Sequence, residues 1–404
     1  MKKIMVVGVG WEQVPLIQKA KKRGLYVVAT TWWDKDKIPA DKIYTADSRD
    51  LDVLENIMLE ENPDYIIADE CDYSMYAVAY LAQKYHLPGP SLGIQTITNN
   101  KFLQRECVKN AGVLQPEYCL CWDMDMGIGF AEQIGYPVMI KPLDNRGSIG
   151  VSKVRAQKDF EKAWLLAVEH SHSRLCIVEK CIRGEVVTAD GFCDSSGFEF
   201  IAASTKDMYE NNDNVAKILY YPGKFSDYTR NRIKQNTELV AEAIGVKYGF
   251  VHIEFIIEEG TGDIYLVEVA NRGGGVFISN VILEQITGID YTGALLDLAM
   301  GQKVDVRCNQ VYISKAMLYF LKLEGKVSLE KCRDQFMGNC KVIYANKYQK
   351  GTDVESKASA GRQGVIVFAG QDFDEMLLEG KRFEKKYCLG KEEVLIFKDE
   401  LIKI

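Results

Sequence analysis

The alternation of apolar and polar positions predicts a β-hairpin within residues 250–275. In residues 251–257 every odd position is apolar, and residues 265–269 repeat the pattern. Between them lies the stretch 259–262, Glu-Gly-Thr-Gly, which is rich in residues that tolerate turn geometry. A hairpin centred on Thr261 has one continuous apolar face, and its other face carries polar side chains.

Two glutamates meet on that polar face. With the turn centred on Thr261, Glu254 lies directly opposite Glu268, and two carboxylates that face each other across a strand pair repel. A hard divalent cation with oxygen ligands, above all Mg²⁺, would relieve this repulsion. Arg272 falls on the same face if the strand continues. The alternatives are a solvated face, on which the glutamates share only water, and a one-residue register shift, which would separate them.

Strands and helices alternate in the first part of the chain. The pattern predicts strands at 4–9, 26–31 and 64–69, and helices at 13–23 and 73–85. This order is typical of a parallel sheet with crossover helices. Gly8 and Gly10 follow the first strand, but Gln13 stands where a dinucleotide motif needs its third glycine, so NAD binding is not predicted.

Residues 88–91, Pro-Gly-Pro-Ser, break this pattern and divide an α/β domain, 1–90, from an α+β unit, 91–303. The second unit is predicted to contain, besides the hairpin, helices at 99–111, 226–244, 276–287 and 291–299, and strands at 136–142, 175–180 and 185–192. The polar stretch 205–214 is predicted to be a mobile loop. A third, α+β unit, 304–404, is predicted to contain strands at 311–321, 341–344 and 364–369, a turn at 361–364 and a helix at 373–385.

Composition narrows the class of protein. The chain has 404 residues, of which 47% are hydrophobic and 26% charged, as in ordinary globular proteins of two to three domains. A net charge of -7 gives no electrostatic footprint for nucleic acid, and no apolar run is long enough to span a membrane. The eleven cysteines are scattered without metal-ligand spacing, which indicates free thiols and a cytoplasmic location.

Several residues before the hairpin could contact phosphate. Lys101 lies in the first turn of a predicted helix, and Lys141 ends a buried strand before a proline. The loop 144–151 follows, and the backbone N–H groups around Gly147 and Gly150 could form a nest for phosphate oxygens. It is not a Walker A loop, because the Gly-Lys-Ser/Thr ending is absent. Taken singly, each feature has a plain alternative, namely a solvated lysine or a hairpin turn.

The order of these features is more informative than any one of them. After the glycine loop come a strand that ends at Glu179, the pair Gly184-Glu185, and then Glu254 and Glu268 with their arginine. This succession resembles the ATP-grasp superfamily over nearly the whole chain. It is most similar to the branch that contains biotin carboxylase, the purine-pathway carboxylases and formyl-ligases, and the L-amino acid ligases.

The resemblance implies a three-part architecture. Residues 1–90 would form a Rossmann-like pre-ATP-grasp domain. Residues 91–303 would form the ATP-grasp domain, which holds the nucleotide between two α+β subdomains with a hinge near 179–182. Residues 304–404 would form a small C-terminal α+β domain.

The resemblance also assigns roles to individual residues. Those that match contacts to the phosphates, adenine or ribose of ATP are Lys101, Lys141, Gly147, Ser148, Ile149, Gly150, Glu179, Lys180, Ile182 and Glu185. Glu254 and Glu268 match the ligands of Mg²⁺ or Mn²⁺. Arg272, together with Lys141, matches the catalytic groups that steady the transferred phosphoryl group or the acyl phosphate.

One position departs from the family pattern. Many relatives read Glu-x-Asn-x-Arg, in which the asparagine is a further metal ligand, whereas this chain reads Glu268-Val269-Ala270-Asn271-Arg272. Asn271 is out of phase in a straight strand. Either the backbone turns Asn271 inward or water replaces it, and Mg²⁺ keeps waters readily.

The implied reaction is that of an ATP-dependent carboxylate–amine ligase, which forms an acyl phosphate that an amine attacks to give an amide or peptide bond, ADP and phosphate. The alternatives are an enzyme that activates bicarbonate or formate, and a nucleotide-binding sensor without catalysis. No residue stands out as a general base. His252 shares the face of Glu254, but a structural histidine explains it equally well.

The expected partners are a small carboxylate and an amine, and homodimerisation is a family expectation. The run Asp69-Glu70-Cys71-Asp72 follows a parallel strand and could contact an amine, although a solvated acidic turn is the favoured interpretation. The sequence does not identify either substrate.

Overall fold

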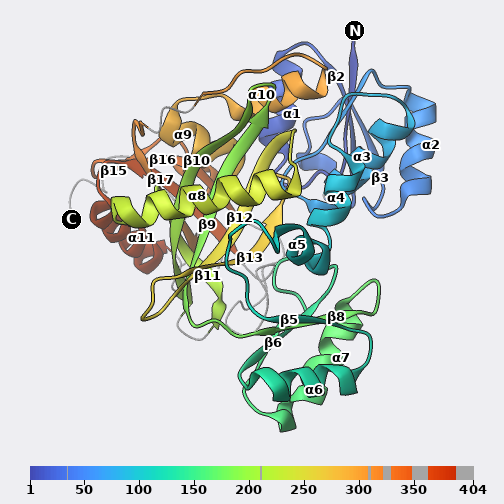
Figure 1. Ribbon diagram of the computed structural model, residues 1–404. Helices are drawn as coiled ribbons and strands as arrows, with labels where there is room; N and C mark the ends of the chain where they lie inside the picture. The colour runs from blue at the N-terminus through green and yellow to red at the C-terminus, as the bar shows by residue number, and fades with distance from the viewer. Residues whose placement is uncertain (34, 210–211, 308–310, 322–328, 348–362, 388–404) are drawn as a thin grey trace.

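The computed structural model describes residues 1–33, 35–209, 212–307, 311–321, 329–347 and 363–387, and within them the strands form three sheets (Figure 1). One is a four-stranded parallel sheet, one a four-stranded antiparallel sheet in a small lobe, and one a nine-stranded antiparallel sheet through the centre. The predicted combination of an α/β part with α+β parts is confirmed.

The first sheet belongs to the amino-terminal domain and has the order β3-β2-β1-β4. Its elements are β1 (Lys3–Val6), α1 (Val14–Lys22), β2 (Tyr26–Thr31), β3 (Lys42–Thr45), α2 (Leu51–Glu61), β4 (Tyr65–Ile67) and α3 (Asp72–Lys84). All of its pairings are parallel, as predicted. The pattern did not reveal β3, because this edge strand buries none of its four side chains fully.

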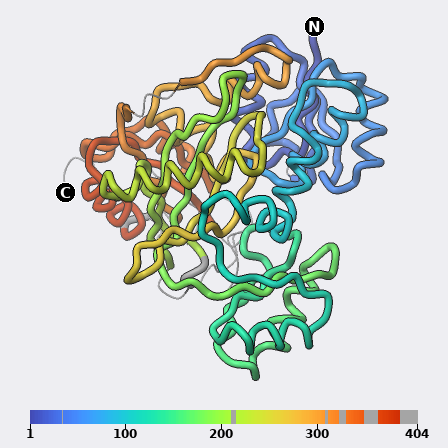
Figure 2. The backbone as a smooth tube through the Cα atoms, in the orientation of Figure 1, coloured from blue at the N-terminus to red at the C-terminus, as the bar shows by residue number. Residues whose placement is uncertain are grey.

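The small lobe projects from the body of the molecule (Figure 2). The helices α4 (Leu92–Thr98) and α5 (Lys101–Val108) precede it. It consists of β5 (Tyr118–Cys121), α6 (Met124–Ile134), β6 (Val138–Pro142), β7 (Ser152–Val154), α7 (Phe160–His170) and β8 (Cys176–Lys180). The strand order is β5-β8-β6-β7, and Val138, Ile140, Phe160 and Trp164 lie in the core between this sheet and its helices.

The central sheet has the order β13-β12-β9-β10-β11-β14-β17-β16-β15. Its strands are β9 (Gly184–Asp194), β10 (Gly197–Tyr209), β11 (Asn212–Tyr221), β12 (Gly249–Glu258), β13 (Ile264–Ala270), β14 (Lys315–Leu321), β15 (Phe336–Met337), β16 (Cys340–Lys347) and β17 (Gly364–Gly370). The helix α8 (Asp227–Ile244) crosses in front of it, and α11 (Phe373–Tyr387) lies at its far end (Figure 1). Because β14 pairs with β11, the strands of the carboxyl-terminal third extend the same sheet.

Two predicted elements are wrong. The polar stretch 205–214 is not a loop, since 205–209 belong to β10 and 212–214 to β11, and residues 210–211 lie outside the described part. Polar side chains of this stretch have partners in place of water: Lys206 binds Glu254, and Asp207 accepts a hydrogen bond from the hydroxyl of Tyr220 at 2.6 Å.

The predicted helix 276–287 begins late. Val276 and Phe277 have φ of 62° and 64°, so a regular helix cannot include them. A π-helical turn, Ile278–Ile282, then leads into α9 (Leu283–Thr287). The helix α10 (Tyr291–Ala299) has the predicted bounds. The strand β14 begins at Lys315, four residues later than predicted. The predicted turn 361–364 lies partly outside the described residues.

One buried cluster joins the first domain to the central sheet. It contains Ile4 and Ile17 of the first domain, Phe192 and Phe250 of the central sheet, and Leu318 of β14. Because these apolar side chains are buried against one another, the first domain is held against the strands that carry the candidate site. No helix in the described part of the chain is long and apolar enough to cross a membrane.

Candidate functional site

Glu254 and Glu268 face each other across β12 and β13, as the hairpin predicted. The register shifts directly after Glu254, because Phe255 pairs with Leu266 and Val267 of β13 is the extra residue of a bulge. The two glutamate side chains are 33% and 31% exposed, so both carboxylates can reach a ligand from solvent.

Each of these carboxylates has its own lysine. Lys206 Nζ lies 2.8 Å from Glu254 Oε1, and Lys101 Nζ lies 3.0 Å from Glu268 Oε1. Burial alone would raise the pKa of Glu254, but the neighbouring charges, Lys206 foremost, lower that pKa to about 2. Lys206 was not among the predicted site residues. Strand parity across 205–209 would have revealed it, had that stretch not been assigned to a loop.

The two carboxylates suit a metal ion that arrives with its substrate. In the described part of the chain, no group of three or more His, Cys, Asp or Glu side chains could hold a metal by itself. Mg²⁺ is usually held by one or two carboxylates, with phosphate oxygens and water completing its shell. Glu254 and Glu268 fit this role.

Lys101 connects the hairpin to the glycine loop. It begins α5, whose amino terminus is capped by the side chain of Asn100, and it is almost fully buried. Its ammonium group reaches Glu268 and also donates to the carbonyl oxygen of Asn145 at 2.5 Å. Lys101 therefore lies between a candidate metal ligand and the loop that is predicted to cover the phosphates.

A buried triad lies beside it. Lys141 Nζ is 2.5 Å from Glu179 Oε2, and Arg105 donates from Nε to Glu179 Oε1 at 2.9 Å and from Nη2 to the carbonyl oxygen of Val267 at 2.7 Å. Burial would raise the pKa of Glu179, but the charges of Arg105 and Lys141 lower it to about 2. Arg105 was missed in the sequence, although it lies one helical turn after Lys101 and thus on the same face of α5.

The glycine loop exposes its backbone. Gly147, Ser148 and Gly150 have φ of 62°, 60° and 75°, and Gly147 and Ser148 are exposed. A Cβ on Gly150 would lie 2.7 Å from Cγ of Pro142, so only glycine fits there without a shift. Ile149 N donates to the carbonyl oxygen of Arg146 and closes a turn at the tip.

Of the predicted adenine and ribose contacts, Glu179 belongs to the triad, whereas Lys180, Ile182 and Glu185 take no part in it. Lys180 is exposed and pairs with Glu117 at 3.1 Å, and Ile182 lies in the short connection between β8 and β9. Glu185 is exposed at the start of β9, where partial burial and the charge of Asp207 raise its pKa. Their roles stay predictions.

Arg272 lies beyond the strand. Because β13 ends at Ala270, Arg272 is not part of the strand face; it turns toward the first domain. Its Nε donates to Asp72 Oδ1 at 3.1 Å and its Nη1 to the carbonyl oxygen of Gly273 at 2.8 Å. Burial, opposed by Asp72 and Glu268, leaves the pKa of Arg272 raised, so the guanidinium stays charged.

The side-chain amide of Asn271 hydrogen-bonds to backbone carbonyl oxygens. It is buried, and its Nδ2 donates to the carbonyl oxygens of Tyr248 and Phe250 at 2.8 Å each. Its Oδ1 accepts from Gln95 Nε2 at 3.2 Å. The amide therefore fixes the end of β13, and water is the better candidate for the vacant ligand position.

His252 has a structural environment. Its Nδ1 lies 2.7 Å from Asp190 Oδ1, and Asp190 also accepts from the hydroxyl of Tyr221 at 2.9 Å. Asp190 is almost fully buried. This network favours the structural interpretation of His252.

The acidic turn is buried, so the expectation of a solvated turn is wrong. Asp69, Glu70 and Asp72 are 4%, 7% and 9% exposed. Asp69 accepts from the backbone N–H of Gly273 at 2.7 Å, and Glu70 Oε1 accepts from Ser279 Oγ at 2.8 Å. These contacts exist because the 272–279 segment folds over the turn, which a local pattern of charges does not reveal.

Glu70 is the unusual member. Its φ is 58°, a left-handed value uncommon outside glycine. Its Oε2 is buried and has no hydrogen-bond partner. Burial and the charges of Glu12 and Asp69 raise the pKa of Glu70 well above its usual range.

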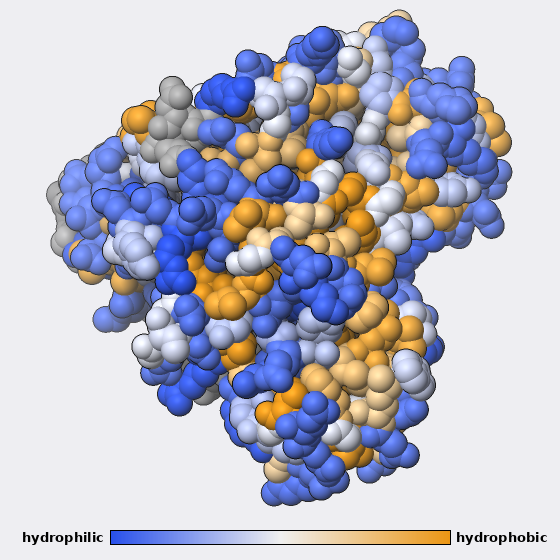
Figure 3. Space-filling model, in the orientation of Figure 1, coloured by the Kyte–Doolittle hydropathy of each residue, from blue (hydrophilic) through white to orange (hydrophobic). Residues whose placement is uncertain are grey.

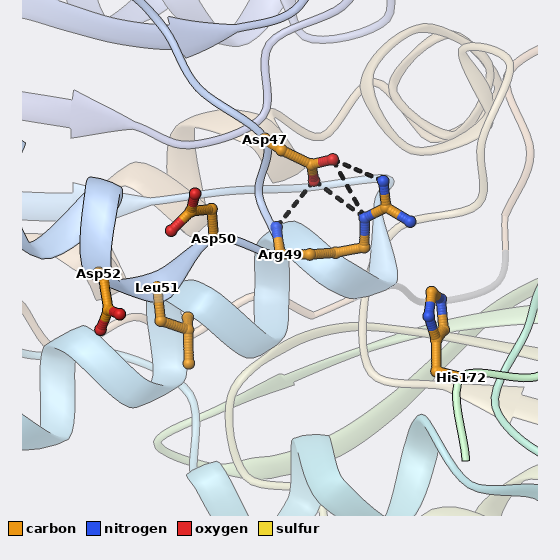
Figure 4. Close-up of a pocket in the computed structure, with 6 residues that line it drawn as sticks. All are labelled: Asp47, Arg49, Asp50, Leu51, Asp52 and His172. Carbon is orange, nitrogen blue, oxygen red and sulfur yellow. Dashed lines mark hydrogen bonds and ion pairs between the residues drawn. The ribbon is translucent and has the colours of Figure 1, made fainter.

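Two cavities lie beside the first domain. The larger, of about 660 Å³, is lined by Asp47, Arg49, Asp50, Leu51, Asp52 and His172. Figure 4 shows Arg49 paired with Asp47, while His172 comes from the small lobe. The other, of about 250 Å³, reaches Tyr73 and Asp144 at the base of the glycine loop. In the space-filling view the outline is indented where the small lobe meets the first domain (Figure 3).

The sequence matches known proteins over this region. Residues 134–280 match the family described as ATP-grasp domain. The chain is 23% identical over 387 residues to a formate-dependent phosphoribosylglycinamide formyltransferase of Methanocaldococcus jannaschii, with 88% of this chain and 95% of that protein covered. It is 20% identical over 323 residues to the carbamoyl phosphate synthase large chain of Clostridium perfringens, where the match covers 75% of this chain but 29% of the relative.

The fold agrees. The structure of an L-amino acid ligase from Bacillus licheniformis superposes with a TM-score of 0.79 at 17% identity and covers 99% of both chains. Residues 134–280 thus match the ATP-grasp domain family, and the fold of the chain is that of solved structures of an L-amino acid ligase and a biotin carboxylase.

Proposed function

We propose that this protein joins a small carboxylate to an amine at the expense of ATP, through an acyl phosphate. The observation that carries the proposal is the pair of facing glutamates, each with its own lysine, together with the hydrogen bond from Lys101 to the base of the glycine loop. Carboxylates, ammonium groups and an arginine thus come together from the central sheet, the small lobe and the start of α3. Such a set is what a phosphoryl transfer from ATP to a carboxylate needs.

Charge neutralisation is the main task of the site. Bound Mg²⁺ would supply a Lewis acid that draws charge from the β- and γ-phosphates. Glu254 and Glu268 would hold it, and Lys206 and Lys101 would then release their carboxylates, which leaves Lys101 free to face the phosphates. Lys141, fixed by Glu179, adds a second preorganised ammonium group.

Arg272 steadies the group that moves. Its guanidinium is held by Asp72, so it needs no reorganisation when the acyl phosphate forms. The transfer breaks the bond between the γ-phosphorus and the β–γ bridging oxygen and forms one to the substrate carboxylate. The glycine loop covers the site and keeps water from the acyl phosphate.

The acceptor amine has a candidate partner in Glu70. The unpartnered and buried Oε2 of this side chain is an acceptor without a donor, and a cationic amine would satisfy it. This oxygen supports an amine among the substrates.

The test is phosphate release from Mg-ATP with pooled amino acids and small carboxylates. We expect one pool to stimulate release and Glu268→Ala to abolish the stimulation, because the metal loses a ligand. Glu259→Ala, which removes an exposed glutamate of the same hairpin, is the matched control and keeps full activity. ATP binding without stimulation by any pool would favour the sensor, and equal activity of Glu268→Ala and the wild type would refute the metal site.

A further inference from the structure

Arg146 crosses from the glycine loop to the first domain. Its Nη1 lies 2.7 Å from Sγ of Cys71, and its guanidinium lies 4.3 Å from the ring centre of Tyr73. Both residues are at the start of α3. Arg146, together with the hydrogen bond from the Tyr73 hydroxyl to Asn145 Oδ1, ties the loop predicted to cover ATP to the start of α3.

Two guanidinium groups share one carboxylate at this place. Arg272 binds Asp72 directly, and the charges of both Arg272 and Arg146 lower the pKa of Asp72, although burial alone would raise it. The sulfur of Cys71, which faces Nη1 of Arg146, is only a weak acceptor. Among the described residues, Nε and Nη2 of Arg146 and Nη2 of Arg272 have no hydrogen-bond partner, so donors remain for an anion.

These free donors lie beside the predicted reaction centre. Glu268 is close enough to Arg272 to raise the pKa of the latter, and Lys101 joins Glu268 to Asn145, the neighbour of Arg146. An anion between the two arginines would therefore touch the glycine loop, the first domain and the predicted metal ligands together.

We propose that Arg146, with Arg272, binds the carboxylate substrate and the acyl phosphate made from it. This inference rests on the proposed ligase function and adds a residue from the loop itself to the acid site. Because Arg146 belongs to the loop and already reaches the first domain, an acid bound between the two arginines adds a further contact that holds the loop over ATP. The loop then excludes water best when an acid is present to be phosphorylated, which limits wasteful ATP hydrolysis.

The test uses inorganic phosphate as the probe, because no substrate needs to be known. Phosphate is titrated by calorimetry into the full-length protein saturated with MgADP. We expect saturable binding to the wild type and at least about tenfold weaker binding to Arg146→Ala, the loss of one charge-assisted contact. Arg146→Lys keeps the charge without the fork and is expected to be intermediate.

Two controls separate binding from folding. Arg155→Ala removes an exposed arginine of the same lobe and should match the wild type. The affinity for MgADP should be equal in all variants, and once an acid substrate is found, Arg146→Ala should raise its KM and leave the KM of ATP unchanged. Equal phosphate affinity in Arg146→Ala and the wild type, or no saturable binding to the wild type at millimolar phosphate, would overturn the inference. A failed ligase assay alone would refute the proposed function and not this anion site.

Discussion

Replacing Arg105 by methionine removes one of the two cations that bind Glu179 in the buried triad. The side chain is fully buried and binds Glu179 and the carbonyl oxygen of Val267. Arg105 and Lys141 together lower the pKa of Glu179 from the ordinary 4.5 to about 2, which corresponds to roughly 3 kcal/mol for the two cations together. Breaking a buried pair costs about 3–5 kcal/mol.

The lower end of this range is expected. Nη1 of Arg105 is buried without a partner, so methionine also removes one unsatisfied donor. A chain of 404 residues that unfolds as one unit has an unfolding entropy of about 0.85 kcal/mol/K, so 3 kcal/mol lowers the Tm by about 4 °C. Differential scanning calorimetry at pH 7 measures this, with Arg183→Met, whose side chain is 85% exposed, as the control that shifts Tm little.

The pH dependence has a defined sign. A carboxylate whose pKa is lowered in the folded state stabilises it fully above the unfolded pKa of about 4.5, and the contribution is lost as the pH falls toward 2. The difference in stability between wild type and Arg105→Met should therefore shrink over this window. Equal Tm values at pH 7, or a difference that grows on acidification, would refute the interpretation of the triad.

Three further predictions concern the site. Lys206→Met should raise the pKa of Glu254 from about 2, so the acid limb of the pH profile of kcat/KM moves to higher pH, whereas Lys217→Met, which breaks a peripheral pair, leaves the profile unchanged. Gly150→Ala strains a residue at φ of 75° and should raise the KM of ATP, whereas Gly129→Ala, on the open surface of a helix, should leave it unchanged. A normal KM of ATP in Gly150→Ala would argue against the loop as a binding site for the phosphates. Glu70→Gln should raise the KM of the amine alone, and an unchanged value would reject Glu70 as its partner.

The sequence was sufficient where the determinants are local. The parity of residues 251–257 and 265–269 placed Glu254 opposite Glu268, and the structure has that pairing even though a bulge follows. The order of strands, glycine loop and charged residues was sufficient for the ATP-grasp fold. These features depend on spacing along the chain, which a sequence displays directly.

The remainder depends on contacts distant in sequence. Lys206 was assigned to a loop because its stretch is polar. Its partner, Glu254, lies 48 residues away in the sequence, so a local pattern does not show that the charge is compensated. The acidic turn was assigned to the surface because the segment that buries it, around Gly273, lies 204 residues further along. A polar side chain with a remote partner has the same local signature as a solvated one, so only the assembled structure distinguishes them.

The central claim is that ATP activates a carboxylate by phosphorylating it. The most direct measurement supplies the stimulating acid with ¹⁸O in its carboxylate and analyses the released phosphate by mass spectrometry. An acyl phosphate that is attacked by an amine leaves one carboxylate oxygen on phosphorus, so the account predicts phosphate that carries one ¹⁸O, formed together with the amide. Unlabelled phosphate alongside amide product would contradict the account, because the carboxylate would then never have accepted the phosphoryl group.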